Sequence, residues 1–404
     1  MINKKPLKGM QDVLPYQSEI RRKVQNIITD TFIQNGFLEI STPSLDSLSL
    51  LANSQGGDNE KIMFKVLKRG EKLNFSNINS IEDLSDMGLR YDLTLPLSRF
   101  YANNMNELPS PFKVFQIGNV WRGERPQRGR FRQFTQCDVD IIGDKSIVAE
   151  ISLIKTIYDA LNNIGFNNIE IKINNRILIN EMIKLYNLEA TSDEVMIILD
   201  KLDKISFEKA CKEAQEKNID IDNFKNIYYY ILKLKKLNIT DLKNSFKSSI
   251  VNDFCNLILT LVNLGCKIKY DPTLIRGMGY YTGTIFEVTD TSLNLSIAGG
   301  GRYDNLVGKV SGIDVPACGF SIGFERIILL LLEKENTFSS KEKIAIIFSK
   351  EHMPIIDKIL VHIRSEQLEG KIVSLIAMKK NLKKQINDLN NLGYDKIILS
   401  KEFI

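Results

Sequence analysis

The residues best suited to chemistry lie in a short arginine-rich segment, residues 121–132. It contains one acidic residue, Glu124, and five arginines: Arg122, Arg125, Arg128, Arg130 and Arg132. Arginine stays charged at any working pH and can bind phosphate oxygens through two parallel hydrogen bonds. Five cations without matching acids repel one another, and a polyphosphate would relieve that repulsion. A surface turn with solvated arginines is the alternative, but strand-like segments on both sides favour a hairpin that presents the loop to a ligand.

Three later segments combine glycine with arginine and tyrosine, namely residues 276–283, 298–304 and 319–326. Glycine lets the backbone approach a ligand closely, and Arg326 is expected in the first turns of a helix. None of these segments has the spacing of a P-loop or of a dinucleotide-binding fingerprint. The ordered set of segments is therefore more informative than the triple glycine it contains.

The histidines and cysteines exclude several other chemistries. Both histidines, His352 and His362, lie near the C-terminus, so zinc sites and Ser/His/Asp catalysis are not expected before that region. The five cysteines are scattered without a Cys-x-x-Cys pair, which favours buried free thiols over disulfides. Chemistry in most of the chain must then rest on arginine, acidic, tyrosine and backbone groups.

The spacing of apolar residues predicts the elements that position these segments. Residues 18–36 predict an amphipathic helix that stops at Gly36, and residues 37–43 predict a strand ended by Pro43. The arginine-rich loop is expected between strands at 113–117 and 137–141. The region after it is predicted as helices over 177–262, strands and glycine turns over 270–323, and a helix over 324–332.

The last part of the chain predicts a separate small domain. Strands at 344–348, 372–376 and 396–399 alternate with helices, which is typical of a parallel α/β unit. Residues 341–404 hold 12 Lys and Arg against 8 Asp and Glu, or +4 of the +5 net charge of the chain. Such a basic segment is compatible with a polyanion partner, and a solvated charged surface is the equally open alternative.

The bulk composition indicates a globular protein of two to three domains. The chain has 404 residues, of which 43% are hydrophobic and 25% charged, as is typical of folded proteins. It contains no apolar stretch long enough for a membrane span and no apolar signal core at its start. We therefore expect a cytoplasmic protein that does not insert into a membrane.

Taken in order, these segments resemble the histidyl-tRNA synthetases. The resemblance extends over nearly the whole chain and is carried by these segments: 8–12, 36–43, 89–94, 122–136, 276–283, 300–304 and 319–326. It implies an α+β fold: a class II synthetase catalytic domain with an antiparallel sheet (residues 1–174 and 263–333), a helical insertion (175–262) and a C-terminal α/β domain like an anticodon-binding domain (340–404). It also implies the activity of a histidine–tRNA ligase, which forms histidyl-adenylate from ATP and transfers histidine to tRNA(His).

Roles for individual residues follow from the same resemblance. For ATP, Arg122 matches a position on the α-phosphate, Glu124 one near the adenine, Arg130 one on phosphate and Arg326 one on the γ-phosphate. The expected contacts to L-histidine are Asp92, Thr94, Arg130, Gln136, Asp140, Arg276, Tyr280 and Tyr281. Among these, Asp140 matches the acid on the α-amino group, the two tyrosines line the imidazole pocket, and Arg276 and Arg122 are the expected catalytic residues. Mg²⁺ is expected with ATP, and segment 36–43 is expected to support a homodimer.

The sequence departs from the family pattern at three points. Gly279 occupies a position that is usually polar, and Asp92 is the shorter of the two acids found at its position. The C-terminal domain is shorter than in the family, which implies either a longer chain or a reduced anticodon contact.

Two non-catalytic alternatives remain open: the regulatory subunit of ATP phosphoribosyltransferase, which is a paralogue, and a synthetase-like sensor of uncharged tRNA. The full set of arginines and Tyr281, together with the basic C-terminal segment, favours the enzyme.

Overall fold

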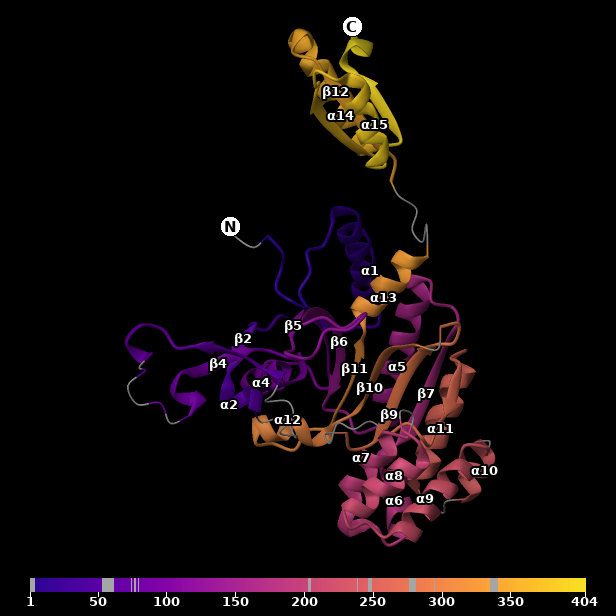
Figure 1. The fold of residues 1–404 in the computed structure, drawn as a ribbon. Helices are drawn as coiled ribbons and strands as arrows, with labels where there is room; N and C mark the ends of the chain where they lie inside the picture. Colours follow the sequence, from indigo (N-terminus) through magenta and orange to yellow (C-terminus); the bar gives the residue numbers. More distant parts are fainter. Residues whose placement is uncertain are drawn as a thin grey trace. The chain divides into compact units, whose positions relative to one another are not determined.

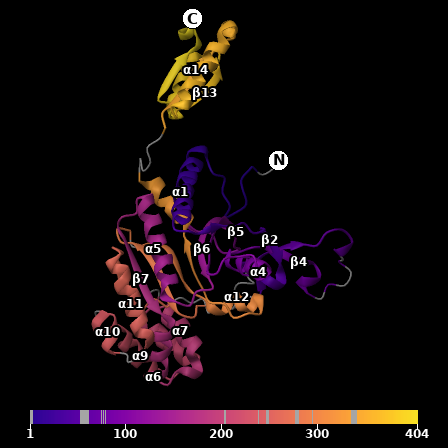
Figure 2. The ribbon, with the colours of Figure 1, turned by 180° about the vertical axis from the view of Figure 1, so that it is seen from behind.

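The computed structural model describes residues 4–52, 62–73, 75, 78, 80–202, 205–237, 239–245, 249–275, 281–293, 295–334 and 341–404. The chain forms two compact units, Met1–Lys334 and Glu335–Ile404, and each is described by itself. Figures 1 and 2 show the ribbon from opposite sides. Within the described ranges, no helix is both long and apolar enough to cross a lipid bilayer.

The first unit is built on an eight-stranded sheet with the order β1-β5-β6-β11-β10-β9-β7-β8. Its strands are β1 (Leu38–Glu39), β5 (Phe112–Trp121), β6 (Gln133–Ile142), β7 (Ile169–Asn175), β8 (Ile268–Tyr270), β9 (Thr284–Asp290), β10 (Leu295–Arg302) and β11 (Ala317–Ile322). The inner strands pair antiparallel, which confirms the expected sheet. The two edge strands differ, because β1 and β8 run parallel to β5 and β7. Parallel neighbours need a long connection, and a helical segment provides it between β7 and β8.

Four helices lie along one face of this sheet (Figures 1 and 2), where they pack on one another and on strands of the sheet. They are α1 (Pro15–Gln34), α5 (Ile147–Ile164), α11 (Ser249–Asn263) and α13 (Phe324–Glu333). Helix α1 starts three residues before the predicted Ser18, because the fixed φ of Pro15 suits the first helical position. Its predicted stop is confirmed, since Gly36 adopts the left-handed φ of +79° that ends the turn.

Side-chain alternation along β6 decides which residues face these helices. Cys137, Val139 and Ile141 are apolar and buried. Burial raises the pKa of the Cys137 thiol well above its usual value, with smaller contributions from Asp138 and from Glu325 of α13. The alternate residues 136, 138 and 140 are polar and line a pocket on the other face. The same strand therefore builds both the core and the floor of the site.

A smaller antiparallel sheet with the order β2-β4-β3 lies beside the main one. Its strands are β2 (Leu45–Ser47), β3 (Phe64–Leu67) and β4 (Ser85–Leu89), and nearby are the helices α2 (Leu48–Ala52), α4 (Thr94–Asn104) and α12 (Asp304–Ser311) and the 3-10 turns η1 (Gly70–Lys72) and η2 (Ile81–Asp83). Helices α4 and α12 pack together. Their shared core includes Tyr91, Leu97 and Val307, and it fixes the loop that precedes α4.

The strand predicted at 37–43 is shorter than expected, because side chains bind the backbone after β1. Arg90 donates from Nη1 to the carbonyl oxygens of Thr42 (2.6 Å) and Pro43 (3.3 Å). The Thr42 hydroxyl donates to Oε1 of Gln116 at 2.9 Å. These buried hydrogen bonds replace the ladder that a longer strand would form.

The region between β7 and β8 is helical, as predicted. It contains α6 (Arg176–Leu185), η3 (Glu189–Thr191), α7 (Ser192–Asp200), α8 (Phe207–Glu216), α9 (Ile221–Leu234), α10 (Ile239–Ser245) and α11. Its helices bury one face each, for example Phe224, Ile227 and Ile231 of α9. These helices belong to the same compact unit as the main sheet.

The second unit is a three-layer α/β fold whose sheet has the order β13-β12-β14. It contains β12 (Lys343–Phe348), η4 (Lys350–Ile355), α14 (Ile356–Leu368), β13 (Ile372–Ala377), α15 (Leu382–Asn391), β14 (Lys396–Leu399) and η5 (Ser400–Phe403). All pairings are parallel, which confirms the prediction. Ile346 faces α14 and Ile347 faces α15, so alternate residues of β12 fill both cores.

Candidate active site

Two adjoining pockets of about 310 Å³ each lie against the main sheet. The first is lined by strands β6, β10 and β11 and by the loop before α4. The second lies between the arginine-rich loop and the start of α13. Arg122, Gln136, Ser321, Gly323 and Arg326 line both pockets, so a ligand in one would meet a ligand in the other at these residues.

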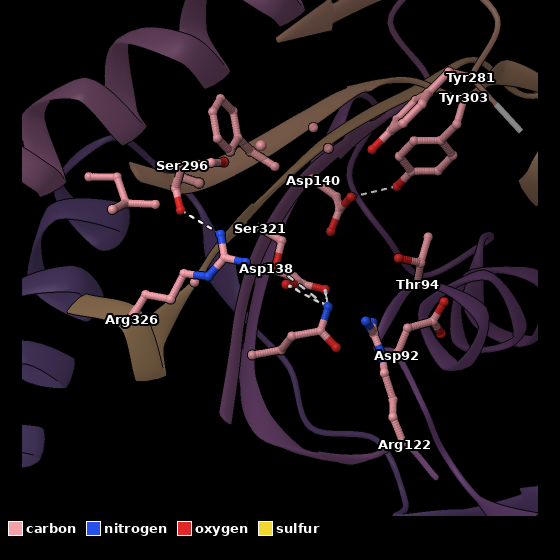
Figure 3. Close-up of a pocket in the computed structure, with 18 residues that line it drawn as sticks. Asp92, Thr94, Arg122, Asp138, Asp140, Tyr281, Ser296, Tyr303, Ser321 and Arg326 are labelled. Carbon is pink, nitrogen blue, oxygen red and sulfur yellow. Dashed lines mark hydrogen bonds between the residues drawn. The ribbon is translucent and has the colours of Figure 1, made fainter. Parts of the chain in front are cut away.

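The first pocket has an acidic floor (Figure 3). Asp138 and Asp140 are each only 5% exposed, and burial raises the pKa of Asp138 to about 7. Burial and the nearby Asp138 raise the pKa of Asp140 well above its usual value, and burial also raises the pKa of Asp92. Three carboxyl groups that resist ionisation together make this pocket a place for a cationic group, which would stabilise their charged forms.

Hydrogen bonds hold the floor in place. The hydroxyl of Tyr303 donates to Oδ1 of Asp140 at 2.6 Å. Gln136 donates from Nε2 to both carboxylate oxygens of Asp138, at 3.1 and 3.3 Å. The other end of this amide, Oε1, is buried and has no hydrogen-bond partner among the described residues. A ligand with a free N–H donor would satisfy it.

Glycines make room for the side chains that line the first pocket. A Cβ atom on Gly319 would lie 1.8 Å from Oδ1 of Asp140, and one on Gly300 would lie 2.0 Å from the carbonyl oxygen of Gly319. A Cβ on Gly301 would lie 2.8 Å from Cδ1 of Tyr281. The glycine-rich segment of β10 therefore permits close strand packing and gives Tyr281 its place beside the first pocket.

Two arginines stand at the junction of the pockets. Arg122 donates from Nε to the carbonyl oxygen of Tyr91 at 2.9 Å, and its guanidinium lies over the ring of Phe134, 5.1 Å from the centroid. Arg326 donates from Nη1 to the carbonyl oxygen of Ser296 at 2.6 Å. Both cations are thus fixed by the protein before any ligand arrives, which is the arrangement that stabilises developing negative charge.

The arginine-rich loop divides into ligand-facing and structural residues. Glu124 and Arg130 line the second pocket. Arg132 instead donates to the carbonyl oxygens of Glu124 (3.2 Å) and Lys8 (3.4 Å), and Arg128 forms an ion pair with Glu333. The expectation that all five arginines lack acidic partners is therefore wrong for Arg128.

A half-buried and a buried ion pair join the elements that carry the site. Arg21 of α1 binds both carboxylate oxygens of Glu325, at 2.6 and 2.7 Å, and Glu325 also accepts from the backbone N–H of Thr135. Arg302 binds both oxygens of Glu150 on α5, at 2.7 and 2.6 Å. Arg302 belongs to a glycine-rich segment that suggested ligand binding, yet its role here is to fix β10 to α5.

The structure brings many of the predicted residues together. Asp92, Thr94, Arg122, Gln136, Asp140, Tyr281 and Arg326 all line the first pocket. Arg276 and Tyr280, like Gly279, lie outside the described residues. Sequence reasoning missed Asp138, Tyr303 and Ser321. The alternation Gln-x-Asp-x-Asp at 136–140 could have revealed Asp138, and Tyr303 follows directly after the triple glycine and Arg302.

An antiparallel sheet that carries an acidic amino-acid-sized pocket beside an arginine-lined one is the catalytic architecture of the class II aminoacyl-tRNA synthetases. The structure of histidyl-tRNA synthetase from Nostoc sp. PCC 7120 superposes with a TM-score of 0.78, at 25% identity, over 97% of this chain and 90% of that one. The sequence model of the histidyl-tRNA synthetase family matches residues 9–327.

Curated relatives agree with this match. The histidine–tRNA ligase of Leifsonia xyli subsp. xyli is 37% identical over 96% of this chain and 93% of its own. The probable histidine–tRNA ligase of Tropheryma whipplei strain Twist is 35% identical over 96% of this chain and 94% of its own. The chain belongs to the histidyl-tRNA synthetase family.

Proposed function

We propose that this protein is a histidine–tRNA ligase, which activates L-histidine with ATP and transfers it to tRNA(His). The observation that carries the proposal is the pair of adjoining pockets that share Arg122, Gln136 and Arg326. In the activation step, a carboxylate oxygen of histidine attacks the α-phosphorus of ATP. The bond from that phosphorus to the bridging oxygen breaks, and pyrophosphate leaves with the electron pair. The nucleophile is already ionised, so the reaction needs fixed cations rather than a general base.

The first pocket would hold histidine. Its acidic floor suits the α-ammonium group and a polar ring, and Asp92, Thr94 and Gln136 lie on its wall. The resemblance assigned Asp140 to the α-amino group. Its hydrogen bond to Tyr303 and its place near Tyr281 (Figure 3) favour the imidazole ring instead, because a ring with one donor and one acceptor nitrogen needs such a carboxyl–hydroxyl pair.

The second pocket would hold ATP. Arg122, Arg130 and Arg326 would bind its phosphates, and Glu124 would lie near the adenine. Arg276 lies outside the described residues. We propose that it acts with Arg122 to stabilise the negative charge at the α-phosphate, and with Arg130 to bind the histidine carboxylate. Tyr280 is proposed to line the imidazole pocket. Within the described residues, no group of three or more His, Cys, Asp or Glu could hold a metal ion. Mg²⁺ fits this site as an ion held mainly by the phosphates of ATP, as its preference for phosphate and water ligands allows.

The remaining assignments rest on the family. We propose that residues 1–174 and 263–333 form the catalytic core, 175–262 the insertion and 340–404 an anticodon-binding-like domain that contacts tRNA(His). The segment 36–43, with the exposed Leu38, would support a homodimer in the cytoplasm. Sedimentation of an active monomer at micromolar concentration would contradict the dimer.

A direct test is histidine-dependent exchange of pyrophosphate into ATP by the purified protein. The ligase is expected to catalyse it with histidine and not with the other amino acids. The non-catalytic paralogue, the regulatory subunit of ATP phosphoribosyltransferase, would show no exchange, and neither would a sensor of uncharged tRNA. Aminoacylation of tRNA(His) by the same preparation would then establish the second step.

A further inference from the structure

Asp138 lies at the centre of the pocket floor, but it has no contact of its own assigned in the reaction described so far. It pairs in the sheet with Gln116 on β5 and with Ser321 on β11, so neighbours on both sides hold its position. Its side chain is 5% exposed and accepts two hydrogen bonds from Nε2 of Gln136. Such a placement lets Asp138 act on the amide of Gln136.

The chemistry of the two groups fixes the orientation of that amide. An ionised carboxylate only accepts hydrogen bonds, whereas the glutamine amide has one donating and one accepting end. The observed orientation, in which Nε2 faces Asp138, therefore matches the ionised form of Asp138, and Ser321 Oγ lies 3.5 Å from the same nitrogen. The accepting end, Oε1, is then left buried and without a partner among the described residues.

The charges around Asp138 favour a cation next to it. Asp92 from the loop before α4 and Asp140 from the same strand add negative charge near Asp138, and Arg122 and Arg90 add positive charge. The ammonium group of an amino acid carries three donors and no acceptor. It can satisfy Oε1 of Gln136 and at the same time offset the carboxyl groups.

We propose that Asp138 is a positioning residue for the amino-acid pocket: it holds the Gln136 amide so that Oε1 accepts a hydrogen bond from the α-ammonium group of the bound amino acid. The proposal rests on the proposed function and adds to it the residue that selects for a free α-amino group. Asp138 acts through Gln136 and does not itself take part in the chemical step.

The test compares wild type with Asp138→Asn, which keeps the side-chain shape but lets the Gln136 amide turn over. Asp159→Asn, on α5 and paired with Lys155, is the matched control outside both pockets. The Michaelis constant for histidine in the exchange reaction is expected to rise roughly tenfold in Asp138→Asn, as for loss of one charge-assisted hydrogen bond. The constant for ATP is expected to stay within about twofold in every protein.

Two inhibitors distinguish a loss of Gln136 positioning from a general disruption of the pocket. Histidinol keeps the ammonium group, whereas 3-(imidazol-4-yl)propionate lacks it. Wild type and Asp159→Asn should bind histidinol much more tightly, and Asp138→Asn should lose most of that preference. An unchanged preference, or an equal loss of affinity for histidine and ATP, would overturn the proposal. If wild type shows no exchange, the proposed function fails, and calorimetric titration of the same two inhibitors still decides the role of Asp138.

Discussion

Tyr303 and Asp140 form a fixed pair at the floor of the first pocket, joined by a 2.6 Å hydrogen bond from the tyrosine hydroxyl to Oδ1. Tyr303 follows β10 and Asp140 lies on β6, so the bond links strands separated by β11. Both residues are buried, at 3% and 5% exposure. Gly319 lies between them, and only a residue without Cβ fits there.

Replacement of Tyr303 by phenylalanine should weaken histidine binding and leave ATP binding intact. The change removes one hydrogen bond to a carboxyl group, which corresponds to roughly 10- to 100-fold in the Michaelis constant for histidine. Exchange kinetics at varied histidine and ATP measure both constants. Tyr394→Phe removes a comparable hydroxyl, which donates to Ser374 in the second unit, and should change neither. Equal Michaelis constants for histidine in Tyr303→Phe and wild type would show that this hydrogen bond does not contribute to histidine binding.

Gly319→Ala tests the same pair from the other side. A Cβ atom 1.8 Å from Asp140 Oδ1 must displace the carboxyl group, so histidine-dependent exchange should fall by at least about tenfold, the effect of a misplaced binding group. Gly165→Ala is the control. Gly165 has a φ of +106° and open space around it, so alanine there should lower the free energy of unfolding by about 1 kcal/mol without changing the histidine constant. Normal exchange by Gly319→Ala would contradict the structure of the floor.

Arg122→Ala should cost the most activity of any single change at the junction. Loss of one preorganised donor near developing charge lowers the rate on the order of 10²–10³-fold. Arg125→Ala removes an exposed arginine of the same loop and should stay within about threefold of wild type. Single-turnover formation of histidyl-adenylate is the appropriate measurement. Similar losses in both variants would mean that the loop acts only through its total charge.

The sequence alone predicts those helices and strands whose pattern of apolar and turn residues is local. The apolar spacing of residues 18–36 and the glycine that ends this segment predicted α1, and the alternation of strands with helices predicted the parallel sheet of the second unit. The strand lengths around the arginine-rich loop were underestimated, because β5 and β6 extend to Trp121 and Gln133 through pairing with each other. Periodicity alone does not report how far two paired strands continue.

Partners distant in sequence could not be predicted. Arg302 pairs with Glu150, and Arg21 pairs with Glu325. Nothing in the local sequence distinguishes these arginines from the ligand-facing Arg326. Arg128 and Arg132 were grouped with phosphate ligands for the same reason, since a cluster of cations shows its acids and carbonyls only after the chain has folded.

The free energy of unfolding should depend on pH through Asp138. Its pKa is about 7 in the folded protein against an ordinary value of 3.8, chiefly because of burial. A raised pKa in an acid contributes stability that is complete below the unfolded value and is lost as pH rises toward the folded value. Between these limits the loss is about 1.4 kcal/mol per pH unit. Asp138→Asn lacks this loss, so its stability relative to wild type should rise with pH. Urea unfolding of both proteins without histidine at about pH 5, 6 and 7 measures the difference in free energy of unfolding. A difference that stays constant over these pH values would contradict the raised pKa.

The second unit should matter for tRNA and not for activation. It forms its own core, and residues 341–404 carry +4 of the net charge. Neutralising phosphates with lysine and arginine releases counterions, so affinity falls with salt at a slope of roughly 0.7 to 0.9 per phosphate contact. Deletion of residues 341–404 should therefore raise the Michaelis constant for tRNA(His) and flatten its salt dependence, while histidine-dependent exchange stays as in the full chain.

A full-length variant distinguishes the effect of the positive charge on tRNA binding from the effect of removing the whole second unit. Lys379, Lys380, Lys383 and Lys384 are exposed around the start of α15, and changing all four to glutamine keeps the fold but removes four positive charges. Because phosphate contacts dominate nucleic-acid affinity at low salt, this variant should resemble the deletion at low salt and approach wild type at high salt. Exchange and aminoacylation are measured side by side on all three proteins. Unchanged tRNA charging by both variants at every salt concentration would mean that the basic segment is only a solvated surface.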